Sequence, residues 1–210
     1  MGTTVHGQER TMAVISRGFR GRREQEPRLP PGQYLERGFP VLSAGPTPRA
    51  DLAAWTFTVT AAGSVLASWT WDELQRLPAD DVVRDIHCVT KWTKLDTSWR
   101  GVSIDTLLDG LPADEYRFAV AHCDGGYTTN LPLEHLRGGQ AWVAYGYDGG
   151  PLAPEHGGPA RLLVPHLYLW KSAKWVRRLD LLHEDQPGFW ERLGYHELGD
   201  PWREQRYWGD

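Results

Sequence analysis

Cys88 is the residue of this sequence whose side chain can take part in the most kinds of chemistry. It stands in the segment 85–92, which reads Asp-Ile-His-Cys-Val-Thr-Lys-Trp. A thiolate is a soft ligand for transition metals, and it is a nucleophile when an imidazole lies within hydrogen-bonding distance. Adjacent residues of a strand point to opposite faces, so His87 is a poor candidate for that base. Taken alone, the segment leaves a metal ligand, a nucleophile and a buried thiol open.

Two later segments combine cationic and small residues in ways that suit an anionic ligand. Residues 154–161 read Pro-Glu-His-Gly-Gly-Pro-Ala-Arg, where the glycines let backbone amides approach a ligand and His156 and Arg161 offer donors. Residues 168–175 read Tyr-Leu-Trp-Lys-Ser-Ala-Lys-Trp, with two lysines three apart that could neutralise a phosphate. Each segment also has a plainer interpretation, a surface loop in the first case and solvated lysines in the second.

A fourth segment, residues 122–130, reads His-Cys-Asp-Gly-Gly-Tyr-Thr-Thr-Asn and follows an apolar run. Its central Asp-Gly-Gly predicts a tight turn that presents polar side chains at a strand end. The turn alone carries no specific chemistry.

Bulk composition excludes some classes of partner. The 210 residues carry a net charge of −4, which gives no electrostatic reason to bind nucleic acid. No apolar run approaches the roughly 18–20 residues of a membrane-spanning helix. Two cysteines, Cys88 and Cys123, are too few for a disulfide framework, so we expect a reducing, cytoplasmic location.

Hydrophobic periodicity predicts many short elements. Alternating apolar residues predict strands over 55–59 and 65–69, and Thr70 followed by Glu73 fits the capping box of a short helix that ends before Pro78. The remaining patterns predict strands over 82–89, 117–123, 141–147, 161–165 and 175–182, and a short helix over 101–111. Such a series, without regular strand–helix alternation, favours an α+β fold that is mostly β with short helices.

The first residues differ in composition from the rest. Residues 1–33 are rich in Arg, Gly, Glu and Pro, so we expect an irregular N-terminal arm followed by one domain over 34–210. Arg22 and Arg23 form a twin-arginine pair, but acidic residues follow where an export signal has its apolar region, so no export signal is expected. Met12 is a candidate for the true initiator.

Together the four segments resemble the sulfite-oxidase and nitrate-reductase superfamily, especially its small bacterial members related to the methionine-sulfoxide reductase catalytic subunit. The resemblance covers the chain from about Pro30 onwards. Its most specific pieces are His-Cys-Val-Thr-Lys-Trp at 87–92, Cys-Asp-Gly-Gly-Tyr-Thr-Thr-Asn-Leu-Pro at 123–132, Pro-Glu-His-Gly-Gly-Pro-Ala-Arg at 154–161 and Trp-Lys-Ser-Ala-Lys-Trp-Val-Arg at 170–177. It implies the molybdopterin-binding fold of sulfite oxidase and a molybdenum–molybdopterin cofactor.

The resemblance also implies roles for individual residues. Cys88 corresponds to the cysteine whose sulfur ligates molybdenum, which makes it both metal ligand and catalytic residue. Substrate is expected beside Trp92 and Tyr127, an assignment that rests on their nearness in sequence. The residues expected to contact the pterin or its phosphate, besides Cys88, are Asp124, Thr128, His156, Arg161, Lys171, Ser172, Ala173 and Lys174.

The activity implied is oxygen-atom or two-electron transfer on a small oxyanion or sulfoxide-type substrate. Full-length sulfite oxidases add a dimerisation domain and some carry a haem domain, for which this chain has no room. Electrons are therefore expected to pass to or from a separate partner. The arginine that binds sulfite in sulfite oxidases has no assignable position here, which puts sulfite itself in doubt.

Three alternatives compete with this prediction. The first is a Cys-dependent hydrolase that uses Cys88 or Cys123 with a histidine, and the second is a Trp-rich module that binds a ligand without catalysis. The third is a zinc site built from His87, Cys88, His122 and Cys123, although the spacing lacks a close-pair zinc motif at either end.

Overall fold

Short strands make up most of the secondary structure in the computed structural model, which describes Met1 and residues 28–210. The strands are β1 (Tyr34–Leu35), β2 (Thr56–Ala61), β3 (Ser64–Thr70), β4 (Asp80–His87), β5 (Trp92–Ser103), β6 (Phe118–Cys123), β7 (Thr128–Pro132), β8 (Trp142–Tyr147), β9 (Gly150–Pro151), β10 (Arg161–Leu163) and β11 (Val176–Leu182). Two short α-helices, α1 (Trp71–Arg76) and α2 (Ile104–Leu108), and several 3-10 turns that all follow α2 complete the described secondary structure. The predicted α+β class, mostly β with short helices, is confirmed.

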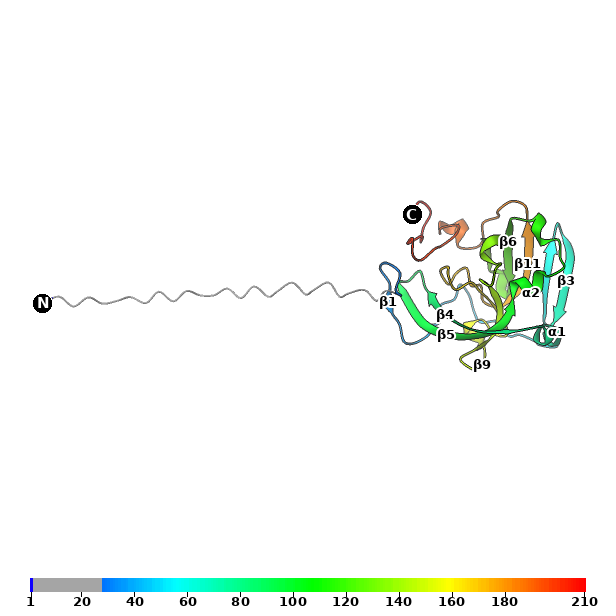
Figure 1. Ribbon diagram of the computed structural model, residues 1–210, viewed down its shortest axis with the longest axis horizontal. Coiled ribbons are helices and arrows are strands. Elements are labelled where there is room, and N and C mark those ends of the chain that lie inside the picture. Colours follow the sequence, from blue (N-terminus) through cyan, green and yellow to red (C-terminus); the bar gives the residue numbers. More distant parts are fainter. Residues whose placement is uncertain (2–27) are drawn as a thin grey trace.

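The strands form two sheets that lie on different sides of the molecule (Figure 1). One follows the order β1-β5-β8-β10, with β4 paired to β5 and β9 paired to β8. The other follows the order β3-β2-β11-β6-β7, in which β11 runs parallel to β2 and antiparallel to β6. The main apolar core includes buried side chains from both sheets, so the sheets are held together by apolar burial.

Local sequence explains where α1 begins. The Thr70 side chain accepts a hydrogen bond from the Glu73 amide, and the Glu73 carboxylate accepts one from the Thr70 amide at 2.8 Å. This capping box was predicted from the spacing. Leu74 is the one fully buried residue of the helix and anchors it to the core.

The region around residue 101 differs from the prediction. Gly101–Ser103 are the last residues of β5, and only Ile104–Leu108 are helical. The Ser103 side chain accepts a hydrogen bond from the Thr106 amide at 3.1 Å and so caps the helix three residues after the predicted start. The first part of the predicted helix over 101–111 was therefore wrong.

The end of the predicted N-terminal arm is anchored to the domain. Arg28 pairs with Asp85 at 2.5 Å and with Asp96 at 2.7 Å, close to both strands of the β4–β5 pair. Residues 2–27, which include Met12, Arg22 and Arg23, lie outside the described residues. Within the described part, no helix combines the length and apolar character needed to span a bilayer.

Candidate functional site

Residues 168–175, between β10 and β11, connect the other three motif segments. The Leu169 amide donates to the His87 carbonyl at 2.8 Å, beside Cys88. The Asp124 amide donates to the Trp175 carbonyl at 3.0 Å, and the Trp175 amide donates to the Gly157 carbonyl at 3.3 Å. Backbone hydrogen bonds thus join four segments that are far apart in the sequence.

Cys88 follows β4 directly and lies at the start of a tight turn into β5. Its amide donates to the Trp92 carbonyl at 2.8 Å, and its carbonyl accepts from the Lys91 amide at 3.0 Å. Lys91 has a φ of 73°, which closes the turn. The Thr90 hydroxyl donates to the Cys88 sulfur at 3.1 Å. The turn therefore fixes the direction of the thiol, which is 7% exposed.

Burial raises the pKa of the Cys88 thiol, while hydrogen bonds around Thr90 and the nearby positive charge of Lys174 oppose the shift. A protonated thiol is a poor nucleophile, and its hydrogen-bonding partner here is a hydroxyl group. The His87 ring instead pairs through Nδ1 with the Thr93 hydroxyl at 2.9 Å. The hydrolase alternative thus has no support at Cys88, whereas coordination to a metal would remove the thiol proton outright.

Arg161 is the most deeply buried cation of the predicted cofactor site apart from Lys171. Its guanidinium donates to the His156 carbonyl at 2.9 Å and to the Ser172 carbonyl at 2.5 Å. Burial lowers the pKa of Arg161 to about 10. No carboxylate pairs with it among the ion pairs of residues 28–210, so its charge is left for an anion.

His156 lies beside this cation, at the end of the 3-10 turn Pro154–His156. Its ring stacks on Phe39 with centroids 3.9 Å apart and planes 4° apart. Burial lowers the His156 pKa, and the positive charges of Lys174 and Arg161 lower it further. Its Nδ1 atom is buried without a hydrogen-bond partner in the described structure, as expected of a group that awaits a ligand.

Lys174 is the second cation that faces this region. Its ammonium donates to the carbonyl groups of Leu42 at 2.7 Å and Glu155 at 2.6 Å. Burial, followed by the charge of Arg161, lowers its pKa to about 8, and a thiolate at Cys88 would raise it. Lys174 is therefore close to both Arg161 and Cys88.

Ser172 and Ala173 fix the backbone between the two lysines. The Ser172 hydroxyl accepts from the Val164 amide at 2.8 Å, and the Ala173 carbonyl accepts from the Leu162 amide at 2.8 Å. Both residues are buried. Their small side chains leave this loop close to β10, which places Lys174 beside Arg161.

The Lys171 side chain does not lie as expected for a phosphate contact. Its side chain is fully buried, and its ammonium lies 2.6 Å from Glu191 Oε1 and donates to Asn130 O at 2.8 Å and Asn130 Oδ1 at 3.1 Å. These three partners use all three ammonium protons. The geometry therefore gives Lys171 a structural role within the protein, and no proton is left for a phosphate.

The 124–128 turn lies against the same loop. The Tyr127 hydroxyl donates to the Trp170 carbonyl at 2.6 Å, and burial raises its pKa well above the ordinary value. Asp124 lies 3.8 Å from Arg177, and the Thr128 hydroxyl oxygen is buried without a partner in the described structure. A contact between substrate and Tyr127 stays a prediction, since its hydroxyl already binds the protein.

Trp92 lies in the buried cluster that also contains Cys88 and is 3% exposed. Its ring meets Phe39 edge to face, with centroids 6.3 Å apart, and its indole nitrogen has no hydrogen-bond partner among the described groups. The structure thus supports a packing role beside Cys88. Whether Trp92 also touches substrate stays a prediction.

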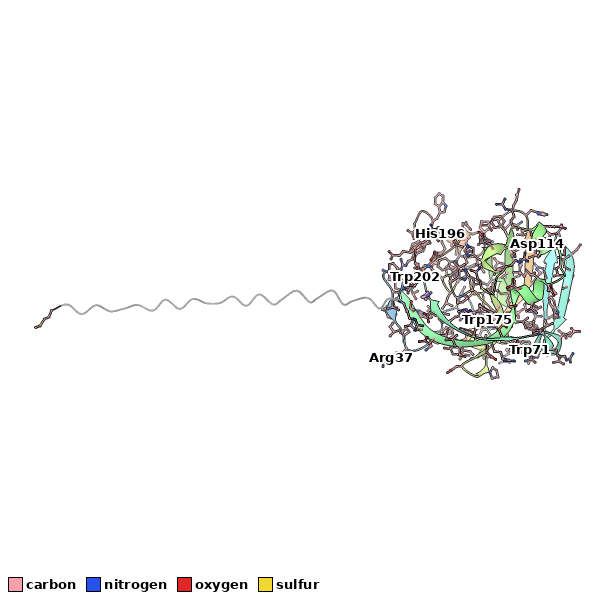
Figure 2. All side chains as sticks on the ribbon, viewed as in Figure 1. Arg37, Trp71, Asp114, Trp175, His196 and Trp202 are labelled. Carbon is pink, nitrogen blue, oxygen red and sulfur yellow. The ribbon has the colours of Figure 1, made fainter. Side chains whose placement is uncertain are left out.

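Sequence patterns missed the contribution of the C-terminal segment. Tyr195 packs against Trp170, with centroids 5.2 Å apart, and against Trp190 at 4.9 Å. Burial raises the pKa of Tyr195, and Tyr207 and Cys88 raise it further. Figure 2 shows the neighbouring His196 and Trp202 on the side of the molecule that holds the C-terminus and β1. Nothing in the local sequence around residue 195 marks it, because its contact with Trp170 forms only in the folded chain.

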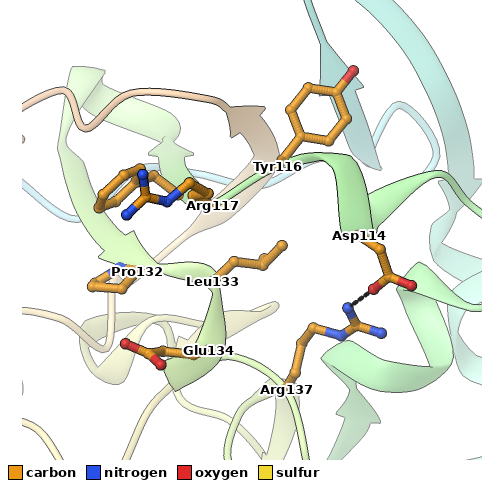
Figure 3. A pocket seen from close by; sticks show the side chains of 8 residues that line it. Asp114, Tyr116, Arg117, Pro132, Leu133, Glu134 and Arg137 are labelled. Atoms are coloured by element: carbon orange, nitrogen blue, oxygen red, sulfur yellow. Dashed lines mark hydrogen bonds and ion pairs between the residues drawn. The ribbon is translucent and has the colours of Figure 1, made fainter.

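Two surface hollows of the structure lie apart from these residues. One, of about 430 Å³, is lined by residues near the start of β6 and the end of β7 and contains the Asp114–Arg137 ion pair (Figure 3). The other, of about 630 Å³, lies beside β5 and β8. Neither includes Cys88, His156 or Lys174.

The donors around Cys88 fit a cofactor that brings its own metal ligands. Among residues 28–210, no three His, Cys, Asp or Glu side chains gather closely enough to hold a metal ion, so the zinc alternative lacks its ligand set there. A dithiolene-bound molybdenum needs one protein sulfur, and Cys88 can supply it. The buried cation of Arg161 and the unpartnered His156 Nδ1 suit the anionic and polar parts of a pterin.

A comparison with protein families agrees with this donor set. A family model described as "Oxidoreductase molybdopterin binding domain" matches residues 44–190. The chain belongs to this family. As a member of the molybdopterin oxidoreductase family, it is a sulfite-oxidase-like enzyme with a molybdopterin cofactor, as the four motifs predicted.

Several proteins are similar to this molybdopterin oxidoreductase. The "Uncharacterized oxidoreductase YuiH" of Bacillus subtilis is 40% identical over 189 residues, which cover 89% of this chain and 96% of that protein. The "Putative protein-methionine-sulfoxide reductase subunit YedZ1" of Azospira oryzae is 29% identical over 71% of this chain and 57% of its own length. The "Protein-methionine-sulfoxide reductase catalytic subunit MsrP" of Gluconobacter oxydans is 26% identical over 69% and 52%. The chain thus spans little more than half of these last two relatives.

A solved structure supports the fold assignment of the oxidoreductase. The sulfane dehydrogenase SoxCD from Paracoccus pantotrophus matches with a TM-score of 0.57 and 21% identity, over 66% of this chain and 41% of that chain. At this identity the match shows a shared fold and carries no assignment of substrate.

Proposed function

We propose that this protein transfers an oxygen atom or two electrons to or from a small oxyanion or sulfoxide-type substrate, with Cys88 as the protein ligand of molybdenum. The observation that carries the proposal is the placement of Cys88. The 168–175 loop meets the end of β4 directly beside it, through the hydrogen bond from the Leu169 amide to the His87 carbonyl, and the positive charge of Lys174 acts on its thiol. When bound, the molybdenum–pterin group supplies the two-electron redox chemistry.

The residues of the chain would perform distinct tasks around that group. Cys88 would hold the metal, with its direction fixed by the Cys88–Trp92 turn. His156, Arg161 and Lys174 would bind the pterin or its phosphate, and the backbone of Ser172 and Ala173 would line the opposite side. Tyr195 packs on Trp170, and burial raises its pKa, so its hydroxyl would keep its proton at neutral pH and could donate a hydrogen bond to a substrate oxygen.

Aromatic residues favour a sulfoxide over a hydrated oxyanion as substrate. Tyr195 lies among Trp170, Trp190 and Tyr207, a surrounding that would stabilise the apolar groups of an organic sulfoxide. Two relatives are named for protein-methionine-sulfoxide reduction, which supports the same choice for this chain.

We further propose a separate electron-transfer partner. The two methionine-sulfoxide reductase relatives are named as subunits, which is consistent with enzymes that work in an assembly. A cytoplasmic location is part of the proposal and rests on cysteine usage alone. Cell fractionation followed by detection of the chain with an antibody tests the location, and recovery outside the cytoplasm would contradict it.

The central test replaces Cys88 with Ser and compares it with Cys123→Ser, a matched change at the other cysteine. Both variants are expressed with molybdenum-cofactor synthesis, and molybdenum content, pterin fluorescence and turnover on methionine sulfoxide and on sulfite are measured. We expect Cys88→Ser to lower turnover more than about 100-fold, because loss of a metal ligand exceeds the usual cost of losing an outer-shell partner. Cys123→Ser should keep molybdenum and activity. Full turnover of Cys88→Ser with normal molybdenum would refute the role of Cys88.

A further inference from the structure

A buried polar cluster lies beneath the C-terminal segment that carries Tyr195. At its centre is Asn130, which is fully buried on β7. Asn130 accepts hydrogen bonds from the Lys171 ammonium through both its backbone oxygen and its side-chain oxygen. Its side-chain nitrogen donates to Asp185 at 2.9 Å and to Glu197 at 2.8 Å. Asn130 thus links the loop before β11 to two points of the C-terminal segment.

Glu191 provides the third point of attachment. Its Oε1 atom lies 2.6 Å from the Lys171 ammonium and accepts from the Trp170 indole nitrogen at 2.9 Å and the Thr129 hydroxyl at 3.3 Å. The Glu191 and Lys171 side chains are both fully buried. The segment 185–197 is therefore attached at Asp185, Glu191 and Glu197 to one buried cation and one buried amide.

This attachment fixes the position of Tyr195. A 3-10 turn, Glu191–Leu193, and the left-handed Gly194 lead directly from the buried carboxylate to the tyrosine. The Tyr195 amide donates to the Trp190 carbonyl at 3.1 Å. Trp170 contacts both residues, since its indole nitrogen binds Glu191 and its ring packs against Tyr195.

We infer that Lys171 and Glu191 are positioning residues, which hold the segment 185–197 so that Tyr195 stays packed on Trp170. Trp170 follows Leu169, whose amide donates to the His87 carbonyl beside Cys88. The inference rests on the proposed function of Cys88 and concerns two residues whose side chains bind other groups of the protein. An apolar pair could fill the same space, but it would lack the directed bonds by which Glu191 orients Trp170 and the turn before Tyr195. The buried ion pair therefore contributes more to the position of the segment 185–197 than to the stability of the fold.

The first test measures hydrogen exchange in the full chain, which reports on the segment whatever the substrate is. Glu191→Gln keeps the size of the side chain and removes its charge. We expect amides of residues 188–199 to exchange at least about tenfold faster, while the strands of both sheets keep their parent rates. The control is Arg137→Met, which breaks the exposed Arg137–Asp114 ion pair and should change neither region.

A second variant covers the case in which Glu191→Gln does not fold. Lys171→Met combined with Glu191→Leu removes both charges together, a replacement that buried ion pairs often tolerate. The positioning role predicts faster exchange of residues 188–199 in this variant too. The inference would be overturned if either variant folded and its residues 188–199 exchanged at the parent rate. Equally faster exchange in all strands would also overturn it.

The second test asks whether Glu191 acts through Tyr195. Turnover per molybdenum is measured for Glu191→Gln, Tyr195→Phe and the double variant, each with its pterin content determined. If Glu191 acts by positioning Tyr195, the turnover of the double variant should be at least about half that of Tyr195→Phe. Losses that multiply in the double variant would overturn the inference. If Cys88→Ser were active but the exchange results held, the proposed function would fail while the attachment of the segment stood.

Discussion

Arg161 shows how one buried cation organises two cofactor-binding segments. Its guanidinium bridges the carbonyl groups of His156 and Ser172, so the 154–161 loop and the 168–175 loop share a single donor. Its Cζ atom also lies 5.6 Å from the ring of Trp99. A planar, forked donor suits this bridge, whereas the point charge of a lysine cannot reach both carbonyl groups.

Arg161→Lys should therefore destabilise the protein and weaken cofactor binding. The change leaves at least one buried carbonyl without a donor, which costs about 2 kcal/mol of unfolding free energy. Urea denaturation and pterin content after purification measure the two effects. Arg178→Lys, on the exposed face of β11, is the matched control and should leave both values unchanged.

His135 and His166 form a second residue-scale feature, away from Cys88. Their Nδ1 and Nε2 atoms lie 3.1 Å apart. Burial, followed by the charge of His135, lowers the pKa of His166 to about 4, against an ordinary value of 6.5. The folded protein therefore binds fewer protons at His166 than the unfolded chain does between these two values.

Stability should fall as the pH falls from 6.5 towards 4. Well above pH 6.5 His166 is neutral in both states and contributes no pH dependence. Because the ring is partly exposed, we expect a loss of about 1–2 kcal/mol after allowance for solvent screening. His166→Gln, which does not titrate, should flatten the dependence of unfolding free energy on pH across this window. An unchanged slope would contradict the assignment to His166.

Candidate site residues within the sequence motifs could be predicted, whereas those far from the motifs could not. Cys88, His156, Arg161 and Lys174 stand in conspicuous local patterns, and the structure brings them to adjoining segments. Lys171 stands in the same pattern as Lys174, yet its ammonium points into a buried cluster, because a spacing of three does not reveal which lysine finds a carboxylate.

Local sequence patterns predicted individual helices and strands correctly only where the secondary structure is regular. The capping box at Thr70 and the alternation around Phe57 led directly to α1 and β2. β5 was missed because irregular pairing interrupts its period of two. Its register with β8 shifts between Arg100 and Gly101, and Asp96 has a φ of 55°.

Gly101 explains why β5 can approach β8 so closely. A Cβ atom at this position would lie 2.6 Å from the Val143 carbonyl oxygen and 2.7 Å from Ala144 Cα. Gly101→Ala should therefore force the strands apart and lower the unfolding free energy by about 2 kcal/mol. Urea titration measures this loss. Gly45→Ala is the matched control, since no atom lies within 4 Å of its added methyl group.

For the whole molecule, the fold class followed from the number of short strands and from the four motifs, whereas the order of strands in the sheets did not. β11 inserts between β2 and β6 and contacts residues more than 100 positions earlier. Such pairings depend on long-range packing that no local pattern encodes. For the same reason, the contacts of the C-terminal segment with Asn130 and Trp170 could not be predicted.

Removal of the cofactor should lower the thermal stability of the entire domain, because the residues proposed to bind it come from both sheets and the loops between them. A ligand present at about 100 times its Kd stabilises by about 3 kcal/mol, which in a chain of this size corresponds to roughly 6–12 °C. Calorimetric scans of molybdopterin-loaded and cofactor-free protein measure the shift. Equal midpoints would indicate that the cofactor does not contact the folded core.

The position of the attached segment in the chain has a consequence for biosynthesis. Every strand of the described fold precedes residue 183, whereas Asp185, Glu191, Tyr195 and Glu197 all follow it. A ribosome therefore delivers the complete set of sheet-forming residues before the residues that attach to Lys171 and Asn130. Both sheets can therefore pair before the segment that carries Tyr195 docks on Lys171 and Asn130.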